Sequence, residues 1–198
     1  RSPSRGLGDV YKRQLLYSDN VLTQRLAMIA TARNGYPVNK TGLNDMMNDK
    51  LSAMGINTVG LHLEDGSGLS GGNRISAVTV SELLLKIRSE PRLKIVYNAL
   101  PTSGESGTLV GRYHETAPQA VGLIKAKTGS TRHTVSLAGF ATSGDKEYVF
   151  VVIADHVGRT KKLQNAARSA IDRMLGTIVK PTPITFNVPV TQALTSSK

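Results

Sequence analysis

The spacing of apolar residues changes twice along the chain, and this pattern limits the folds that the chain can adopt. Up to about residue 100 the apolar side chains recur at the spacing of a helix face. Between residues 121 and 155 they follow the shorter period of strands, and from residue 161 the helical spacing returns. Helices, then consecutive strands, then a helix predict an α+β fold and not alternating βαβ units.

Two helices are expected in the first part of the chain. The stretch "VLTQRLAMIATARNG" predicts a helix from Val21 that ends at Gly35, because glycine adopts the left-handed conformation that closes many helices. Residues 41–54 predict a second helix, which ends at Gly55. Its methionines are interpreted as core residues and not as ligands.

A glycine-rich loop, "DGSGLSGGN", leads to a third helix, "VSELLLKIRS". Two starts fit this helix: Ser76 as a simple N-cap, or Thr79 with Glu82 as a capping box. A shorter helix, "RLKIVYNAL", then ends at Pro101.

The second part of the chain predicts an antiparallel meander over residues 121–130, 134–142 and 147–155, with an "SGDK" turn before the last strand. Residues 161–178 predict a final amphipathic helix. Its inward face is expected to carry Leu163, Ala166, Ala167, Ile171 and Leu175.

The first fourteen residues, "RSPSRGLGDVYKRQ", differ in character from the rest. They are basic, follow no apolar period and look like translated adaptor sequence. We therefore expect a non-native leader at 1–14, one folded domain at 15–178, and a tail containing proline and threonine at 179–198.

The formal net charge is +11, which suits an anionic partner. The positive residues are scattered singly and in pairs, and only three phenylalanines and six tyrosines are available for stacking on bases. This pattern argues against nucleic acid and suits an acidic polymer of the cell envelope. Without cysteine the chain has no disulfide or thiolate chemistry, and its amino end shows no apolar segment typical of a secretory signal.

One expected strand, "VGLIKAKTGST", ends in polar residues and carries the first candidate site. It begins as a buried strand and then presents an amine, two hydroxyls and a glycine at Lys127, Thr128, Gly129 and Ser130. On a strand, Thr128 and Ser130 project to one side and Lys127 to the other. Hydroxyls near an amine bind a carboxylate, and a glycine lets a ligand approach the backbone. With the Ser130 N–H donating to an oxyanion, the stretch predicts an acyl-transfer site.

The same tripeptide also fits a surface hairpin with a glycine bulge, and the chain contains it twice. The second copy, Lys40-Thr41-Gly42, follows Pro37 and has no strand before it, so we interpret it as a turn and the start of a helix. The strand context therefore favours Lys127 over Lys40.

Ser18-Asp19-Asn20, immediately before the first expected helix, is the second candidate. One interpretation is an N-cap, a role that suits serine, aspartate and asparagine alike. In the other interpretation, Ser18 passes a proton to a leaving amine while Asn20 holds a substrate carbonyl or a catalytic lysine.

Ser-Asp-Asn followed by Lys-Thr-Gly matches two of the three signatures of penicillin-binding proteins and serine β-lactamases. The stretches "DGSGLSGGNRIS", "LPTSGESGTL" and "KAKTGSTRHTVSLAGF" narrow the match. From about Leu15 to about Leu175 the chain resembles the D-alanyl-D-alanine carboxypeptidase/endopeptidase family of low-molecular-mass penicillin-binding proteins. The resemblance implies the C-terminal part of a transpeptidase-like catalytic domain, in which a helical cluster packs on an antiparallel sheet.

The resemblance also implies roles for the candidate residues. Ser18 and Asn20 would transfer protons and hold substrate, with Lys127 beside Ser18 to polarise it. Thr128 and Ser130 would bind the terminal D-alanine carboxylate, and the Ser130 N–H would form half of the oxyanion hole. No metal or organic cofactor is implied.

The third family signature is the nucleophilic serine of Ser-x-x-Lys, upstream of Ser-x-Asn, and it is missing here. The only such spacing, Ser143 to Lys146, falls in the predicted hairpin turn, and we interpret it as coincidence. We therefore expect a fragment that is inactive as given. The nucleophile, and any inserted domains, would belong to the upstream part of the protein.

Other polar residues are expected to have no role in chemistry. Asp65 and Ser67 in the glycine-rich loop are interpreted as turn residues. The four histidines show no metal-ligand spacing, and His133 is expected to face solvent.

The expected whole protein is a serine-type carboxypeptidase or endopeptidase that acts on peptidoglycan stem peptides outside the cytoplasmic membrane, with β-lactams as covalent inhibitors. Two alternatives stay open: a β-lactamase or esterase on the same fold, and a non-catalytic peptidoglycan-binding module. The stretches 65–76 and 100–109 argue against the first, and an upstream Ser-x-x-Lys would argue against the second.

Overall fold

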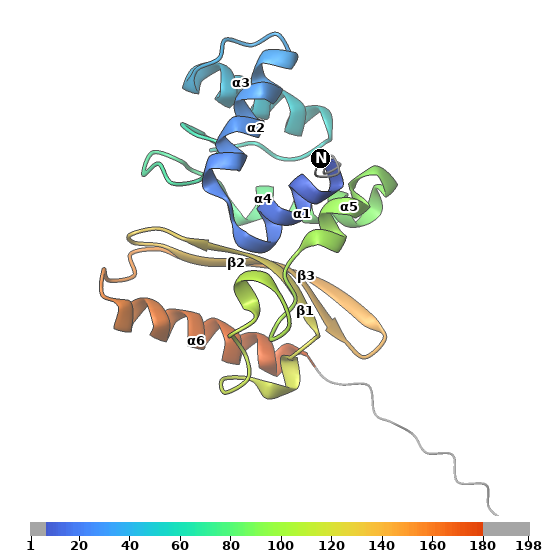
Figure 1. Ribbon diagram of the computed structural model, residues 1–198, viewed down its shortest axis with the longest axis vertical. Coiled ribbons are helices and arrows are strands. Elements are labelled where there is room, and N and C mark those ends of the chain that lie inside the picture. Colours follow the sequence, from blue (N-terminus) through green and yellow to red (C-terminus); the bar gives the residue numbers. More distant parts are fainter. Residues whose placement is uncertain (1–6, 180–198) are drawn as a thin grey trace, which may run out of the picture.

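An antiparallel sheet in the order β1-β2-β3 forms the centre of the computed structural model, which describes residues 7–179 (Figure 1). Its strands are β1 (Ile124–Ser130), β2 (Val135–Ser143) and β3 (Lys146–Ala154). The predicted α+β class and the meander are confirmed. The first strand begins at Ile124 and not at residue 121, because Pro118–Ala120 form a 3₁₀ turn and Gly122 has a φ of 78°.

Both faces of this sheet are covered, as the alternation along β2 shows. Val135 and Leu137 belong to one hydrophobic cluster, whereas Ala138 and Phe140 belong to another. Because successive side chains of a strand point to opposite faces, the two clusters lie on opposite faces of the sheet. The sheet is therefore a central layer between two groups of helices and loops.

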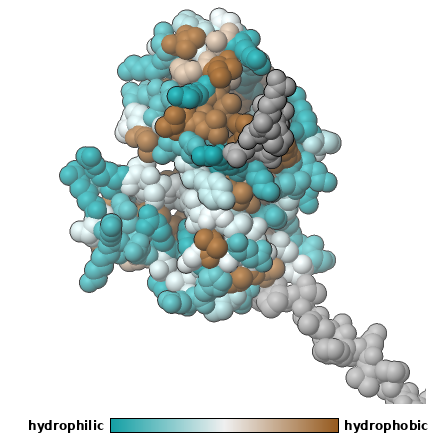
Figure 2. Space-filling view, viewed as in Figure 1, coloured by the Kyte–Doolittle hydropathy of each residue, from teal (hydrophilic) through white to brown (hydrophobic). Residues whose placement is uncertain are grey.

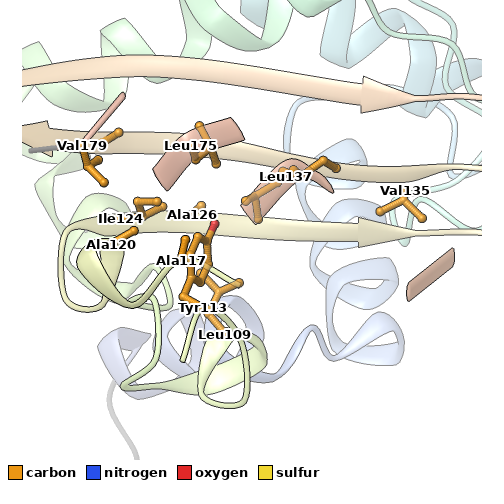
Figure 3. Packing of buried hydrophobic residues seen from close by; sticks show 12 residues of the cluster. Leu109, Tyr113, Ala117, Ala120, Ile124, Ala126, Val135, Leu137, Leu175 and Val179 are labelled. Atoms are coloured by element: carbon orange, nitrogen blue, oxygen red, sulfur yellow. The ribbon is translucent and has the colours of Figure 1, made fainter. Parts of the chain in front are cut away.

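The helix α6 (Lys161–Ile178) and the connection that precedes β1 cover the first face (Figure 3). The bounds of α6 are those predicted, and Ile171 and Leu175 are buried as expected. The predicted inward position of Leu163 is wrong, since its side chain is 51% exposed, and Ala166 is exposed too. The first turn of α6 packs on the preceding loop instead of the sheet: a Cβ on Gly158 would meet Leu163 Cδ1 at 2.4 Å.

Three helices cover the second face: α1 (Leu7–Tyr17), α4 (Ala77–Ser89) and α5 (Lys94–Ala99). The helix α1 crosses the boundary that we expected after residue 14. Leu15 packs against the second cluster, and Gln14 Nε2 donates a hydrogen bond of 2.6 Å to Thr23 Oγ1. This bond joins α1 to α2 (Asn20–Arg33), so residue 14 takes part in the packing of the helices.

The helices α2 and α3 (Lys40–Ala53) lie farther from the sheet, and hydrophobic residues gather on this helical part in the view of Figure 2. Lys40 begins α3, as predicted for the second Lys-Thr-Gly. For α4 the simple cap is right, because Ser76 Oγ accepts from the Thr79 N–H at 3.0 Å. The capping box is wrong, since Glu82 accepts from the N–H of Asn57 instead. Within residues 7–179, no helix combines the length and apolar character needed to cross a bilayer.

The close pairing of β1 and β2 depends on Gly139, which lies opposite Ala126. A Cβ at position 139 would meet Lys125 O at 2.1 Å and Ala126 Cα at 2.6 Å. We expect Gly139→Ala to lower the free energy of unfolding by about 1–3 kcal/mol, the usual effect of overpacking, in urea titrations followed by circular dichroism.

Gly71→Ala is the matched control, since an added Cβ there would meet nothing within 4 Å. It should leave the free energy of unfolding unchanged or raise it slightly, because alanine restricts the unfolded chain. Equal losses in both variants would contradict the close strand contact.

Candidate functional site

Ser18 occupies the turn between α1 and α2 with a φ of 57°, in the left-handed region that residues other than glycine seldom adopt. The next residue, Asp19, caps α2 by accepting from the Leu22 N–H at 3.0 Å. The capping role predicted for this motif therefore falls to Asp19. Ser18 and Asn20 line an adjacent cavity instead.

Lys127 of β1 reaches this turn across 109 positions of sequence. Its Nζ donates to Ser18 Oγ at 2.7 Å and to the carbonyl oxygen of Thr128 at 3.0 Å. No carboxylate of the described residues pairs with it. Burial lowers the pKa of the Lys127 amine below its ordinary 10.5. In its neutral form, this amine can keep one N–H on the carbonyl and turn its lone pair toward the Ser18 hydroxyl.

Some backbone N–H groups of β1 point to the edge of the strand that is not paired with β2. The N–H groups of Ile124 and Ala126 bond to the segment 101–103, on the edge of β1 away from β2. Strand N–H groups alternate between the two edges, so those of Thr128 and Ser130 point to the same outer edge. The Ser130 N–H therefore faces away from the ladder with β2, as a donor to a ligand must.

The side chains of Thr128 and Ser130 project to the α6 side of the sheet. Thr128 Oγ1 donates to Thr108 Oγ1 at 2.9 Å. Arg168 Nη2, from α6, donates to Ser130 Oγ at 2.8 Å. Both hydroxyls are thus held in place by residues outside the strand.

An open cavity of about 500 Å³ connects the two candidate motifs. It is lined by Ser18 and Asn20 and by residues 127–131 at the end of β1, with residues 67–69 of the glycine-rich loop also present. The turn before α2 and the end of β1 are therefore two walls of one cavity.

The pairing of β1 with β2 favours a glycine at position 129, a preference that the sequence pattern did not show. It lies opposite Ser136 of β2, and a Cβ at position 129 would meet Ser136 Oγ at 2.3 Å. A side chain at position 129 would therefore displace a residue that also lines the cavity.

The glycine-rich loop is organised by Asp65. Its carboxylate accepts hydrogen bonds from Ser67, Gly68, Ser70 and Asn73. Although burial raises the pKa of the Asp65 carboxyl, these bonds together hold the pKa below its ordinary value. Asp65 and Ser67 thus act as turn residues, although Ser67 also lines the cavity.

Two further expectations concern residues outside the cavity. His133 is exposed and is absent from the cavity wall. Within residues 7–179, no group of histidine, aspartate and glutamate side chains is arranged to hold a metal ion.

Three residues at or beside the site were not predicted from the sequence. Gln14 lines the cavity, although it falls in the stretch interpreted as a leader. Thr108 contacts Thr128 from within the quoted stretch 100–109, where a threonine gave no signal by itself. Arg168 lies on α6, and no local pattern distinguishes it from Arg173, the other arginine of this helix.

The left-handed conformation of Ser18 predicts a local cost in stability. A non-glycine residue at such a φ costs about 1–2 kcal/mol. Ser18→Gly should therefore raise the free energy of unfolding by about 1 kcal/mol in urea, whereas Ser18→Ala, which keeps a Cβ, should not. Equal values for the two variants would contradict a strained backbone at this turn.

Burial of Lys127 predicts a dependence of stability on pH. Its pKa is lower in the folded chain than the ordinary 10.5, so the unfolded chain binds more protons between these two values. The free energy of unfolding of the wild type should therefore rise relative to Lys127→Met as the pH increases through this window toward 10.5. Urea titrations over a series of pH values measure the difference between the two proteins.

Lys40→Met, at a lysine whose side chain is 69% exposed, is the control and should follow the wild-type pH curve. A constant difference between wild type and Lys127→Met at every pH would contradict the lowered pKa.

Comparison with known proteins identifies the family of the chain. A family model described as the D-Ala-D-Ala carboxypeptidase 3 (S13) family matches residues 2–178, a range that includes most of the expected leader. Carboxypeptidase DacB of Mycolicibacterium smegmatis is 34% identical over 164 residues, covering 80% of this chain and 36% of that protein. A D-alanyl-D-alanine carboxypeptidase of Actinomadura sp. is 39% identical over 110 residues, covering 53% of this chain and 20% of that protein.

The crystal structure of penicillin-binding protein 4 (DacB) from Haemophilus influenzae, complexed with a β-lactam, superposes with a TM-score of 0.75 at 26% identity. The superposition covers 90% of this chain and 45% of that protein, so this chain spans less than half the length of these relatives. Fold and sequence lead to the same conclusion: the chain belongs to the D-Ala-D-Ala carboxypeptidase 3 (S13) family.

Proposed function

We propose that this chain supplies the Ser-x-Asn and Lys-Thr-Gly part of a serine-type D-alanyl-D-alanine carboxypeptidase or endopeptidase that acts on peptidoglycan stem peptides. The main support is the hydrogen bond of 2.7 Å between Lys127 Nζ and Ser18 Oγ. Burial of an amine without a carboxylate partner opposes folding, and amines with a lowered pKa in a cleft are typical of catalytic sites.

In the proposed reaction, the nucleophilic serine belongs to a Ser-x-x-Lys in the part of the protein outside this chain. Its hydroxyl passes its proton to the lysine of that motif, its oxygen bonds to the carbonyl carbon of the penultimate D-alanine, and the peptide C–N bond then breaks. Ser18, polarised by Lys127, passes a proton to the nitrogen of the leaving amino acid and takes up the proton that the other lysine received. Water hydrolyses the resulting ester, which releases the shortened peptide and restores the serine.

Other cavity residues would bind the peptide. The hydroxyl of Ser130 would donate to its terminal carboxylate, and that of Thr128 would do so after turning away from Thr108 Oγ1. The amide of Asn20 would hold a substrate carbonyl. The Ser130 N–H, which faces the outer edge of β1, would donate to the oxyanion, a contribution worth about 10²–10³ in rate. Because Gly129 has no side chain, the substrate could lie directly against the backbone there.

The proposed substrate determines where the whole protein would act and which inhibitors would bind it. Peptidoglycan lies outside the cytoplasmic membrane, so the whole protein would act there. β-Lactams would acylate the same serine as the peptide, as covalent inhibitors of the whole enzyme. No metal or organic cofactor enters the proposed reaction.

Two labelling experiments with a fluorescent penicillin test this function. The chain as printed should form no covalent adduct, because its nucleophile lies elsewhere. In the whole protein, Lys127→Ala should slow acylation by about 10²–10⁴, the usual effect of removing an acid–base group. Lys40→Ala is the matched control and should have little effect, because Lys40 lies outside the cavity.

Equal losses in the two lysine variants would show that the wrong Lys-Thr-Gly was chosen. A labelled band from the printed chain would place a nucleophile within it; Ser18 would be the first candidate, tested with Ser18→Ala. Release of D-alanine from a stem peptide supports the carboxypeptidase. Rapid β-lactam turnover without such release would favour the β-lactamase alternative, and binding without either reaction would favour the binding module.

A further inference from the structure

A second hollow of about 400 Å³ continues from the first on the α6 side of β1. Residues 128–130 and Ser136 line both hollows, so the two form one cleft that runs past the end of the strand. Thr108, Arg112 and Arg168 also line the second part, and the two arginines make it cationic. Neither arginine takes part in the proposed reaction.

The two arginines differ in their partners. Arg112 is paired with Asp172 at 2.5 Å, with the side chains only 14% and 4% exposed, so its charge is compensated. Arg168 donates to Asn165 Oδ1 and to Ser130 Oγ, each at 2.8 Å, and none of the ion pairs of residues 7–179 includes it. Its positive charge is therefore available to an anion in the cleft.

The backbone at Arg168 is anchored by the buried pair. Arg112 Nη2 also donates to the carbonyl oxygen of Arg168 at 3.3 Å, and Thr116 Oγ1 donates to Asp172 Oδ2 at 3.3 Å. These bonds tie the middle of α6 to the segment before β1. Arg168 consequently projects from a fixed turn of the helix toward the end of β1.

We propose that Arg168 binds the terminal carboxylate of the peptide together with Thr128 and Ser130, an inference that rests on the proposed function. An N–H of Arg168 already donates to Ser130 Oγ, so the hydroxyl proton of Ser130 is free to donate to an anion. The guanidinium and the Ser130 hydroxyl together present donors to the two oxygens of a carboxylate, and charge-assisted bonds are about twice as strong as neutral ones. The cleft therefore selects peptides with a free carboxylate.

Chemical-shift titration of the isotope-labelled printed chain tests this role with three ligands. They are N-acetyl-D-alanyl-D-alanine, the same peptide with a carboxamide end, and sodium acetate. The variants are Arg168→Gln, Arg168→Lys and the control Arg173→Gln, which changes an exposed arginine of the same helix that does not line the cleft.

Arg168→Gln should weaken binding of the carboxylate peptide about tenfold and leave binding of the carboxamide peptide within twofold, because only the carboxylate meets the charge. Arg168→Lys should recover part of the loss, since it keeps the charge without the planar fork. Arg173→Gln should match the wild type. Equal weakening of both peptides by Arg168→Gln would mean a structural role and would overturn the proposal, as would an unchanged preference for the carboxylate.

Acetate separates this inference from the proposed function. Saturable acetate shifts at Thr128, Ser130 and Arg168 that disappear in Arg168→Gln support the anion site, even if neither peptide binds and the peptidase proposal fails. Acetate shifts that do not depend on Arg168, or no shifts at all, would overturn the anion site whatever the peptides do.

Discussion

The site depends on a sheet whose two faces are both buried, because this sheet holds Lys127 against a turn that is distant in sequence. The α6 side anchors β1 and β2 through the cluster around Leu137, and the opposite side carries α1 and α4 through the cluster around Phe140. Because both faces are buried, each strand can pair with its neighbour in only one register. With β1 in place, the Lys127 amine reaches Ser18 at the end of α1.

Two residues at the site have conformations or surroundings that do not favour folding. Ser18 has a positive φ, and Lys127 is a buried amine without a carboxylate partner. The rest of the fold compensates for these costs by packing. The buried pair of Arg112 and Asp172 anchors the α6 turn that carries Arg168.

Much of the site was predictable, because its residues occur in short patterns with local meaning. The sequence alone identified the strand that ends in Lys127 to Ser130. It also identified Ser18 and Asn20 at the start of a helix. Thr108 and Arg168 were not, since nothing near them in the sequence distinguishes a residue that meets β1 from one that faces solvent. The exposure of Leu163 was missed for a related reason: helical periodicity gives the direction of a face but not the length that the sheet covers.

By itself, the sequence determined the kinds of element, their order, and the chemical groups that each can present, because periodicity and turn residues act over a few neighbouring positions. Only the tertiary structure decided which groups meet. The contact of Lys127 with Ser18 spans 109 positions, and that of Arg168 with Ser130 spans 38. Contacts of this kind follow from how layers pack on one sheet, and packing is a property of the whole chain and not of any short stretch.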